Sequence, residues 1–580
     1  MPRIEELGEV ITIDMLIVGG SIGGLSTAIR AKEESPDLNI LVVDKQTVGW
    51  SGAAPRGGMV IWVLSPEDDI ERLMEFHVNN LGCFLNDQEL LFEYSRGAYN
   101  AIEKIAEWGV AMPRDDGGNI EITKVFQPPH FNPDYWSYVC VDTDLLVPLR
   151  KTARQKGVKI LNKIQVVELL KEGDRVIGAV GFNIIDGRFY IFKAKTTVLA
   201  NGLCGDREGL YAASCGEGVA AAYRAGAEMR NAEFGNMMMF GMREGYTSVG
   251  TYYTISFINK PPMYTLMSNA SGERLSNLYD TNPAGGNFLL NIEKEINEGR
   301  GPIYIDVEES MLKNQTEILE TKSHWPRKKF TSIESRHMDK VKKYGKNPIP
   351  KAEAEFKVMS NCSPVKVDHH MKTTLEGLWA IGDTSMGGSS WAGAIVAPPG
   401  GMCGSGLGNA MFAALRGAPS ATRYALEAET PEIKYSDVKS IKEKIFAPMG
   451  REKGLSPDEA ILALKEATSP IKYYLHRNKT NLEEALSKIE EVKLKLPDLY
   501  AEDYHGLCKC HEVSSMTLGP ELNFMAALTR TESRGTHFRE DYPERDDKNW
   551  LKWIVIKQEA GKMKAHTEPV PIEKYKIKLG

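Results

Sequence analysis

The stretch that most constrains the fold is residues 14–45, which read DMLIVGGSIGGLSTAIRAKEESPDLNILVVDK. An apolar run, a glycine-rich turn, a helical pattern and a second apolar run follow one another, which predicts a β–α–β unit. Gly19, Ser21 and Gly24 occupy the three positions of a G-x-G-x-x-G turn. In that turn the first glycine permits the bend and the last lets the helix pack against the strand, so that the helix N-terminus faces a pyrophosphate.

Ser21 and Asp44 decide how well this turn suits a dinucleotide. Serine in place of the second glycine weakens the fit, because the backbone approaches the phosphates less closely, although its hydroxyl can itself donate to a phosphate oxygen. Asp44 ends the second strand, where a carboxylate accepts hydrogen bonds from ribose hydroxyls. A buried turn followed by a surface aspartate is the alternative. The turn, both strands and the acid together favour a dinucleotide site, without separating FAD from NAD.

The length and charge of the chain narrow the classes of protein it can be. Its 580 residues predict about two to four domains. The formal net charge of −7 at pH 7 argues against nucleic acid or anionic membranes as partners. No run of about 18 apolar residues occurs, so no membrane-spanning helix is expected. The first residues, MPRIEELGEVITID, contain acids and no apolar core, so we expect no signal peptide and a cytoplasmic location.

The eight cysteines are scattered along the chain, and without a secretion signal they are expected to be reduced. No C-x-x-C pattern occurs, and the tight cluster is CKCH, which contains Cys508, Cys510 and His511. A metal site there would need further ligands that the neighbouring sequence does not supply, so an ordinary structural role is favoured. We therefore expect no metal and no iron–sulfur cluster within this chain.

Segments further along the chain favour FAD. Residues 195–205 (KTTVLANGLCG) and 376–388 (EGLWAIGDTSMGG) each read as a strand that runs into a glycine turn, which indicates a nucleotide-binding domain interrupted by an insertion. Four other segments resemble motifs of the fumarate reductase/succinate dehydrogenase flavoprotein family: CGEGVAAAYRAGAEMRNAEF (215–234), NASGERLSNLY (269–279), EINEGRGPIYIDV (295–307) and TRTESRGTHFREDYPERDDKNW (529–550). Within that family, residues 188–202 and 373–383 are similar in wording to the α subunit of adenylylsulfate reductase.

The resemblance implies an α/β fold in which a Rossmann-like FAD-binding domain is interrupted by an α+β capping domain and followed by a C-terminal helical domain. The expected boundaries are 1–230 plus 356–430 for the FAD-binding domain, 231–355 for the capping domain, 431–545 for the helical domain and 546–580 for a C-terminal extension. In the helical part, Ser456 and Glu459 form a capping-box pattern. Residues 481–496 have apolar side chains at helical spacing, which predicts a core-facing helix.

The loop WSGAAPRGG (50–58) follows the nucleotide-binding unit. In the family a histidine near the start of this loop is bonded covalently to the flavin, and Ser51 stands at that place here. The resemblance therefore implies noncovalent FAD, as in the adenylylsulfate reductase branch, with a lower reduction potential that favours substrate reduction. It also places a helix N-terminus, preceded by VAPPGGMCGSG (396–406), at the N1–C2=O edge of the flavin, where its positive end stabilises the reduced flavin. The predicted FAD contacts are Gly19, Ser21, Ile22, Gly23, Gly24, Asp44, Lys45, Ser51, Gly52, Gly57, Gly58, Val166, Ala200, Asn201, Gly202, Asp383, Gly400, Gly401 and Met402.

The arginine that fumarate reductases use as proton donor is missing. By resemblance its place falls near Gly285, and no Arg or Lys occurs between Asp280 and Leu290. A dicarboxylate site needs positive charge to offset the two negative charges of its substrate. The sequence therefore argues against plain fumarate or succinate chemistry.

The pattern of the adenylylsulfate reductase branch also changes at its functional positions. The arginine that faces the sulfur substrate in that branch falls on about Gly241, with Arg243 two residues later, and an asparagine near the flavin corresponds to Trp62. Three successive methionines, 237–239, precede Arg243. These positions predict a less charged, more apolar pocket, which suits a bulkier, less polar or thioester-type substrate.

Four residues are the candidates for catalysis: His369, His370, Arg243 and Tyr252. The histidine pair matches the substrate histidine of the family best, and an imidazole there can anchor a carboxylate or donate a proton. The alternative, a pair that makes structural hydrogen bonds at a domain seam, stays equally open. Tyr252 can donate from its phenol, although an aromatic residue in a strand is more often structural.

These residues lead to one main hypothesis and two rivals. The main one is a flavoprotein subunit that exchanges electrons between noncovalent FAD and an organic or sulfur-containing small-molecule substrate, as a reductase fed by an iron–sulfur, ferredoxin-like partner subunit in a hetero-oligomer. The first rival is an adenylylsulfate reductase α subunit with shifted binding residues. The second is an electron-relay subunit whose FAD has no substrate of its own. An open pocket with the histidines and Arg243 would favour an enzyme, and a closed apolar pocket the relay.

Overall fold

The structure is a computed structural model that describes most of the chain. The described residues are 2–56, 60–126, 135–141, 144–207, 214–234, 237–242, 267–275, 292–306, 351–360, 364–386, 405–535 and 537–579. The helices are α1 (Ile22–Glu34), α2 (Ile70–Phe76), α3 (Gln88–Glu107), α4 (Leu146–Gln155), α5 (Glu217–Ala225), α10 (Ser405–Glu427), α11 (Tyr435–Phe446), α12 (Pro457–Thr468), α13 (Lys479–Lys495), α14 (Tyr504–Met516), α15 (Leu518–Thr529) and α16 (Asp547–Trp550). The remaining secondary structure forms four β-sheets.

The largest sheet has seven strands and carries the predicted β–α–β unit. Its order is β6-β2-β1-β9-β8-β7, with β15 paired to β9. The strands are β1 (Glu9–Val18), β2 (Ile40–Asp44), β6 (Lys159–Asn162), β7 (Ile164–Glu172), β8 (Arg175–Asn183), β9 (Phe189–Leu199) and β15 (Leu378–Ala380). β1 is parallel to both β2 and β9, and β15 is parallel to β9. All five residues of β2 are buried, as expected of a parallel strand covered on both faces.

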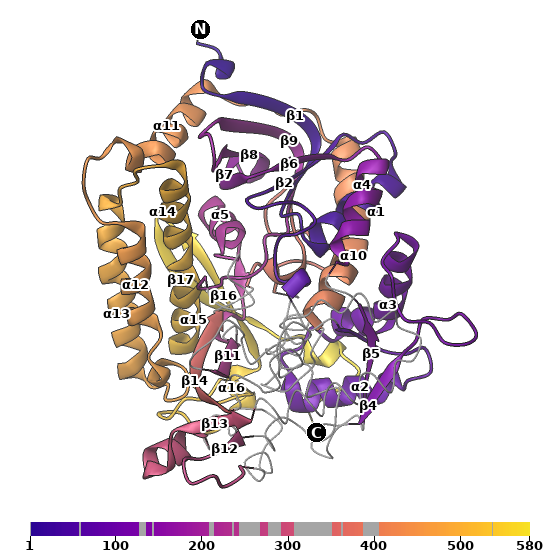
Figure 1. The fold of residues 1–580 in the computed structure, drawn as a ribbon, viewed down its shortest axis with the longest axis vertical. Coiled ribbons are helices and arrows are strands. Elements are labelled where there is room, and N and C mark those ends of the chain that lie inside the picture. The colour runs from indigo at the N-terminus through magenta and orange to yellow at the C-terminus, as the bar shows by residue number, and fades with distance from the viewer. Residues whose placement is uncertain are drawn as a thin grey trace, which may run out of the picture.

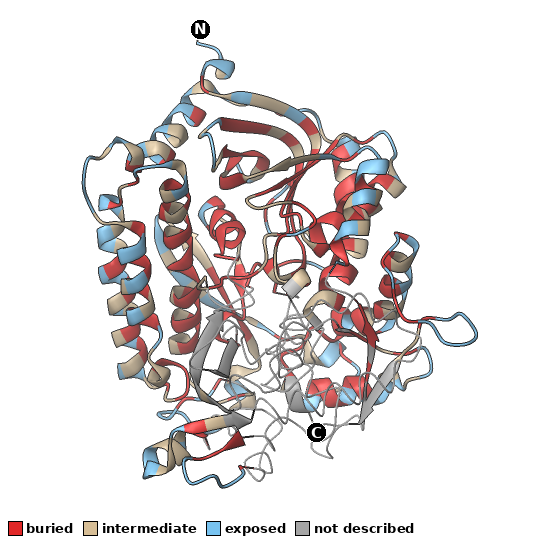
Figure 2. Ribbon diagram, viewed as in Figure 1, coloured by how far each residue is buried: buried red, intermediate tan, exposed pale blue. Residues whose placement is uncertain are grey.

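Helices cover this sheet from both sides. In Figure 1, α1, α4 and α10 lie together at one side of the sheet, and α5 lies on the other side near α14. Buried residues of α1, α4, α5 and α10 and of the sheet strands belong to one hydrophobic cluster, and the ribbon is largely red in this part of Figure 2. A mixed sheet between helical layers confirms the expected α/β fold.

Three smaller sheets complete the β structure. β11 (Met237–Met242), β12 (Met267–Ser268), β13 (Ile303–Asp306) and β14 (Lys351–Ser360) form an antiparallel sheet that begins in the range expected for the capping domain, and β14 extends past its expected end at residue 355. β3 (Val60–Val63), β4 (Thr123–Phe126) and β5 (Tyr135–Cys140) form a second one, which the sequence patterns did not predict. β10 (Met229–Arg230) pairs with the C-terminal hairpin of β16 (Lys552–Glu559) and β17 (Lys562–Pro569), so the end of the chain returns to the FAD-binding part.

The helices α11 to α15 form the predicted C-terminal helical region, beside the main sheet (Figure 1). The capping box at the start of α12 is confirmed, because the Glu459 N–H donates to Ser456 Oγ (3.2 Å) and the Ser456 N–H donates to Glu459 Oε2 (3.0 Å). The predicted core-facing helix is α13, which buries Leu482, Ala485 and Ile489. Among the described helices, none is long and apolar enough to cross a bilayer.

Candidate cofactor site and active site

The carboxyl ends of β1, β2, β9 and β15 lie at one edge of the main sheet, where a nucleotide-binding crevice is expected, and we call this edge the crevice. The Gly19 N–H donates to Val43 O, the Ala200 N–H to Val18 O and the Ile381 N–H to Leu199 O, each at 2.8 Å. Because β1, β2, β9 and β15 are parallel, the turns that follow them lie side by side. Ligands of open α/β sheets bind at such a carboxyl edge.

The glycines of the first turn are fixed by close backbone contacts. Gly19 has φ +112°, and a Cβ there would lie 2.2 Å from the carbonyl oxygen of Ala200. A Cβ on Gly24 would lie 1.9 Å from the carbonyl oxygen of Gly19. Both contacts are with backbone, which cannot move aside, so only glycine fits at either position.

The N-terminal end of α1 is open toward this crevice. Ser21 is its N-cap residue, and the Ser21 side chain makes no capping hydrogen bond. The first backbone N–H groups of an α-helix, here those of Ile22, Gly23 and Gly24, have no partner within the helix. Together with the positive end of the helix dipole they suit the pyrophosphate of a dinucleotide.

Asp44 stabilises the loops around the crevice by accepting three hydrogen bonds. Its Oδ2 accepts hydrogen bonds from the Gly20 N–H (2.6 Å) and the Ser51 hydroxyl (2.7 Å), and its Oδ1 accepts one from the Gln46 N–H (2.6 Å). A carboxylate has about four acceptor sites, so one more bond, to a ribose hydroxyl, remains a prediction. Ser51 is thereby fixed against the turn, and a Cβ on Gly52 would lie 2.8 Å from Ser21 Oγ.

The turn after β9 supplies the opposite wall of the crevice. Gly202 has φ +83° and exchanges hydrogen bonds with the Thr384 hydroxyl (both 3.1 Å), beside the predicted contact Asp383. The Oδ1 atom of Asn201 is buried without a hydrogen-bond partner among the described residues. A buried acceptor of this kind normally finds a donor, and a bound nucleotide can supply one. The residues present therefore fit a dinucleotide, although no described contact tests each predicted FAD residue.

Lys45, a predicted FAD contact, forms ion pairs that the sequence did not predict, and its role at FAD stays a prediction. Its ammonium pairs with Glu217, at the start of α5, and with Glu512 of α14 (2.5 Å). Although burial lowers the pKa of Lys45, the carboxylate of Glu217 outweighs this effect and raises the pKa above its usual value. The sequence did not reveal this arrangement, because the three residues are distant in the chain.

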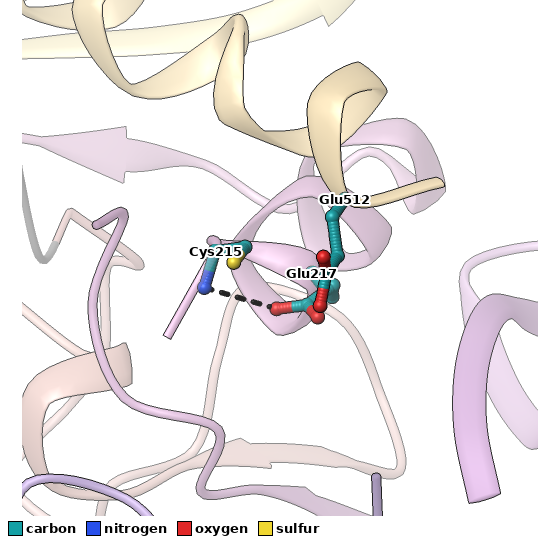
Figure 3. A group of neighbouring side chains, drawn as sticks. All are labelled: Cys215, Glu217 and Glu512. Carbon is teal, nitrogen blue, oxygen red and sulfur yellow. Dashed lines mark hydrogen bonds between the residues drawn. The ribbon is translucent and has the colours of Figure 1, made fainter. Parts of the chain in front are cut away.

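Cys215, Glu217 and Glu512 form the one group of potential metal ligands found among the described residues, with ligand atoms within 4.8 Å of one another (Figure 3). The ammonium of Lys45 already pairs with both carboxylates. Burial raises the pKa of the Cys215 thiol to about 12, and a metal ligand must be the thiolate. We therefore interpret the group as an ion-pair cluster with a neutral thiol.

His369 is held between the start of α3 and the middle of α10. His369 Nε2 hydrogen-bonds Asp87 Oδ2 (2.9 Å), which raises the pKa of His369, and its carbonyl accepts from Arg416 Nε (2.7 Å). Arg416 lies 11 residues into α10 from Ser405, about 16 Å along the helix at 1.5 Å per residue. His370 is exposed on the same turn. These contacts suit the structural alternative, a pair at a domain seam, while the assignment of His369 or His370 as proton donor stays a prediction.

Trp62 does not form a wall of a substrate pocket in the way the sequence suggested. Its side chain is 1% exposed and stacks on Tyr94, with ring centroids 5.7 Å apart, and Tyr94 contacts Phe412 edge-on. These rings form a core between β3, α3 and α10. The predicted residues Arg243, Tyr252, Gly57, Gly58, Gly400, Gly401 and Met402 lie outside the described residues and stay predictions.

His476 joins the segment before β13 to the helical region, a contact that sequence patterns missed. Its Nε2 hydrogen-bonds Glu293 (2.5 Å) and its Nδ1 hydrogen-bonds Glu540 (2.7 Å). Only an imidazolium donates from both nitrogens. Burial lowers the pKa of His476, but the two carboxylates outweigh it and raise the pKa above 6.5.

We expect a pH-dependent contribution of His476 to stability. Because its folded pKa is raised, the contribution is fully present below the unfolded pKa of about 6.5 and is lost as pH rises through the folded pKa. The melting temperatures of the wild type and of His476→Gln should therefore differ at pH 6 and converge at pH 9. His505→Gln, which changes an exposed histidine, is the control and should match the wild type at both pH values. A constant difference for His476→Gln would contradict the assignment of an imidazolium.

Comparisons with known proteins agree with this geometry. Residues 14–395 match the family model described as FAD binding domain, and residues 471–580 match the model described as fumarate reductase flavoprotein C-term. One subunit of the fumarate reductase (CoM/CoB) of Methanothermobacter marburgensis is 25% identical, over 94% of this chain and 97% of that protein. Among solved structures, a variant of the E. coli quinol fumarate reductase flavoprotein aligns with a TM-score of 0.77 at 18% identity, over 97% of each chain. The adenylylsulfate reductase of Archaeoglobus fulgidus aligns with a TM-score of 0.75 at 21% identity, over 98% of this chain and 97% of that one.

Proposed function

Because the chain belongs to the fumarate reductase/succinate dehydrogenase family of FAD-dependent flavoproteins, we propose that it is the noncovalent flavoprotein subunit of a reductase. Its substrate is an organic or sulfur-containing compound other than plain fumarate. FAD, when bound, supplies hydride or electron-pair transfer. The residues of the crevice would hold it: the N-terminal end of α1 faces the pyrophosphate, Asp44 the ribose, and the turn at Asn201 the opposite side.

The observation that carries the noncovalent assignment is the position of Ser51. Its hydroxyl donates to Asp44 (2.7 Å), and its side chain is buried against the glycine turn. A serine hydroxyl held in this way offers no imidazole for a covalent bond to flavin. Without that bond the flavin has the lower potential that suits reduction.

We expect acid precipitation to release the flavin from the purified protein. The denatured chain no longer holds a noncovalent ligand, so the yellow colour should appear in the supernatant and the pellet should be colourless. The absorbance of both fractions near 450 nm measures this. A yellow pellet that survives washing would contradict noncovalent binding, while a colourless protein before precipitation would contradict FAD binding itself.

The electron donor is proposed to be a separate iron–sulfur subunit. Six cysteines are described, none of them in a disulfide, and five of these are buried: Cys140, Cys204, Cys215, Cys508 and Cys510. Among the described residues, the one group whose ligand atoms lie close enough to hold a metal contains a single cysteine, Cys215, whereas an iron–sulfur cluster of this kind needs four cysteine ligands. The Methanothermobacter relative is named as one subunit of its fumarate reductase, which supports a multi-subunit assembly.

The substrate class rests on the lack of a cation between Asp280 and Leu290. To test it, the flavin is reduced anaerobically and its reoxidation is followed after addition of fumarate, of adenylyl sulfate, or of an enoyl thioester, with AMP plus sulfite as the reverse control. Reoxidation by the enoyl thioester is the expected result. Rapid reoxidation by fumarate would contradict the proposal, reaction with adenylyl sulfate would assign the first rival, and no response would favour an electron relay.

A further inference from the structure

Four charged side chains meet behind the nucleotide crevice, and we call them the Lys45 network: Lys45, Arg207, Glu217 and Glu512. Lys45 pairs with Glu217 and with Glu512 (2.5 Å), and Arg207 Nη1 donates to the second oxygen of Glu512. The two cations and two anions balance. Glu217 pairs with one cation, and Glu512 pairs with two. Removal of the Glu512 charge would therefore leave both Lys45 and Arg207 with less negative charge to balance them.

The Lys45 network is largely withdrawn from water. The exposed fractions of its side chains are 15% for Lys45, 10% for Glu217 and 7% for Glu512, with 29% for Arg207. Burial opposes ionisation of Glu217, but the ammonium of Lys45 outweighs it and lowers the pKa of Glu217. Charges paired at low exposure are screened little by salt, and removing one partner leaves a costly uncompensated charge.

The members of the network come from both walls of the crevice and from the helical region. Lys45 directly follows Asp44, and Glu217 begins α5, where a Cβ on Gly218 would lie 2.4 Å from Asn201 Oδ1. Glu512 belongs to α14, which lies beside α5 in Figure 1. One helix of the C-terminal region therefore contacts both segments that are expected to hold the adenosine part of FAD.

Two further contacts strengthen this attachment of α14. The side chain of Gln165, next to the predicted FAD contact Val166, donates to the carbonyl of Cys508 in α14 (3.3 Å). Arg207 has φ +66°, an unusual conformation for a residue with a side chain. A strained residue persists where the surrounding structure requires it, and here Arg207 reaches Glu512.

We propose that the Lys45 network couples FAD binding to the docking of α14, with Glu512 as a positioning residue for the cofactor. FAD can bind only when the segments around Asp44 and Asn201 are in one particular arrangement relative to each other. The Lys45 network holds these two segments in that same arrangement. By linkage, FAD then stabilises the docked helix, and the docked helix strengthens FAD binding by the same factor. The inference rests on the FAD site of the proposed function and adds a residue of the helical region to it.

Hydrogen exchange of the full-length protein, with FAD and after its removal, tests the coupling without any variant. We expect FAD to slow exchange of the amides of α14 about ten-fold, a coupling within the usual range. The amides of α13, which lies in the same region without contact to the network, provide the internal control. Equal exchange of α14 in both forms, in a protein that still binds FAD, would overturn the coupling. Failure to bind FAD at all would instead contradict the proposed function.

The variant Glu512→Gln tests the residue itself. We expect its FAD dissociation constant to rise about ten-fold and the effect of FAD on exchange of α14 to be lost. The matched control is Glu521→Gln, which removes the pair with Lys493 (2.6 Å) in α15, away from the crevice. Equal FAD affinity in the two variants would contradict the proposal. If Glu512→Gln does not fold, Arg207→Gln removes the other partner of the same carboxylate and is judged by the same comparison.

Discussion

Gly24→Ala should strip FAD from the protein, whereas Gly23→Ala should leave it bound. A Cβ on Gly24 would lie 1.9 Å from the carbonyl oxygen of Gly19, so α1 would have to move away from β1. On Gly23 it would lie 3.3 Å from the Ile381 side chain, which can adjust. Overpacking of this kind costs about 1–3 kcal/mol, which corresponds to roughly a 5- to 150-fold rise in the FAD dissociation constant if the displaced helix end is what binds the pyrophosphate.

The two variants form a matched pair because both residues lie in the first turn of α1. Each change replaces a helical glycine by alanine, which alone would stabilise the helix by about 1 kcal/mol. Any difference between them therefore reports the contact with Gly19 and not helix propensity. The flavin-to-protein absorbance ratio after gel filtration, followed by titration of the stripped protein with FAD, measures the effect. Equal flavin retention by the two variants would contradict the prediction, because it would show that the glycine turn can accommodate a Cβ on Gly24.

The sequence predicts the FAD-binding unit because its signals are local. The β–α–β pattern, the buried run that becomes β2, and the Ser456–Glu459 capping box each depend on residues that are close in the chain, and each is confirmed. The antiparallel strands β3 to β5 were missed, because they are short and because β3 pairs with β5 across more than 70 residues, from Val63–Ser137 to Val60–Cys140. Long-range pairing of this kind leaves no periodic signal in one sequence.

The candidate site was harder to predict than the fold. Asp44 was expected to face a ribose, and the structure adds that it also orders the turn through Gly20 and Ser51. Lys45 was expected at FAD, which stays a prediction, and the structure adds that its ammonium pairs with Glu217 and Glu512. In both cases the chemistry of the side chain was read correctly, but its partners come from segments that only the folded chain brings together. The sequence identifies a residue that carries a carboxylate or an ammonium, but it does not identify the oppositely charged residue with which that group pairs.

The C-terminal motif TRTESRGTHFREDYPERDDKNW (529–550) was recognised by resemblance, and its structure gives it a physical role. Arg530 is fully buried and donates from Nε to Glu233 (2.9 Å), from Nη1 to Glu532 (2.9 Å) and from Nη2 to the Lys552 carbonyl (2.7 Å). Glu233 lies just before β11. The motif therefore clamps the segment through which the chain passes from the FAD-binding part into the sheet of the expected capping domain.

Arg530→Lys should destabilise the protein by about 3–5 kcal/mol, the cost of breaking a buried charge pair. An ammonium cannot reproduce the forked donors of a guanidinium, so Glu233 is left buried with too few donors. Burial already raises the pKa of Glu233, against the opposing effect of Arg530. An acid with a raised folded pKa destabilises the fold above its unfolded pKa, so the loss should be larger at pH 8 than at pH 5.

Arg545→Lys is the matched control for this change. Arg545 pairs with Asp547 (2.7 Å), and both side chains are about one-third exposed, at 33% and 37%, so the same substitution should cost no more than about 1 kcal/mol. Thermal unfolding of both variants at pH 5 and pH 8 separates the two cases. If Arg530→Lys melts like Arg545→Lys, the buried contacts of the motif do not hold the entry to β11. If it melts lower at both pH values by the same amount, Glu233 is not the group left uncompensated.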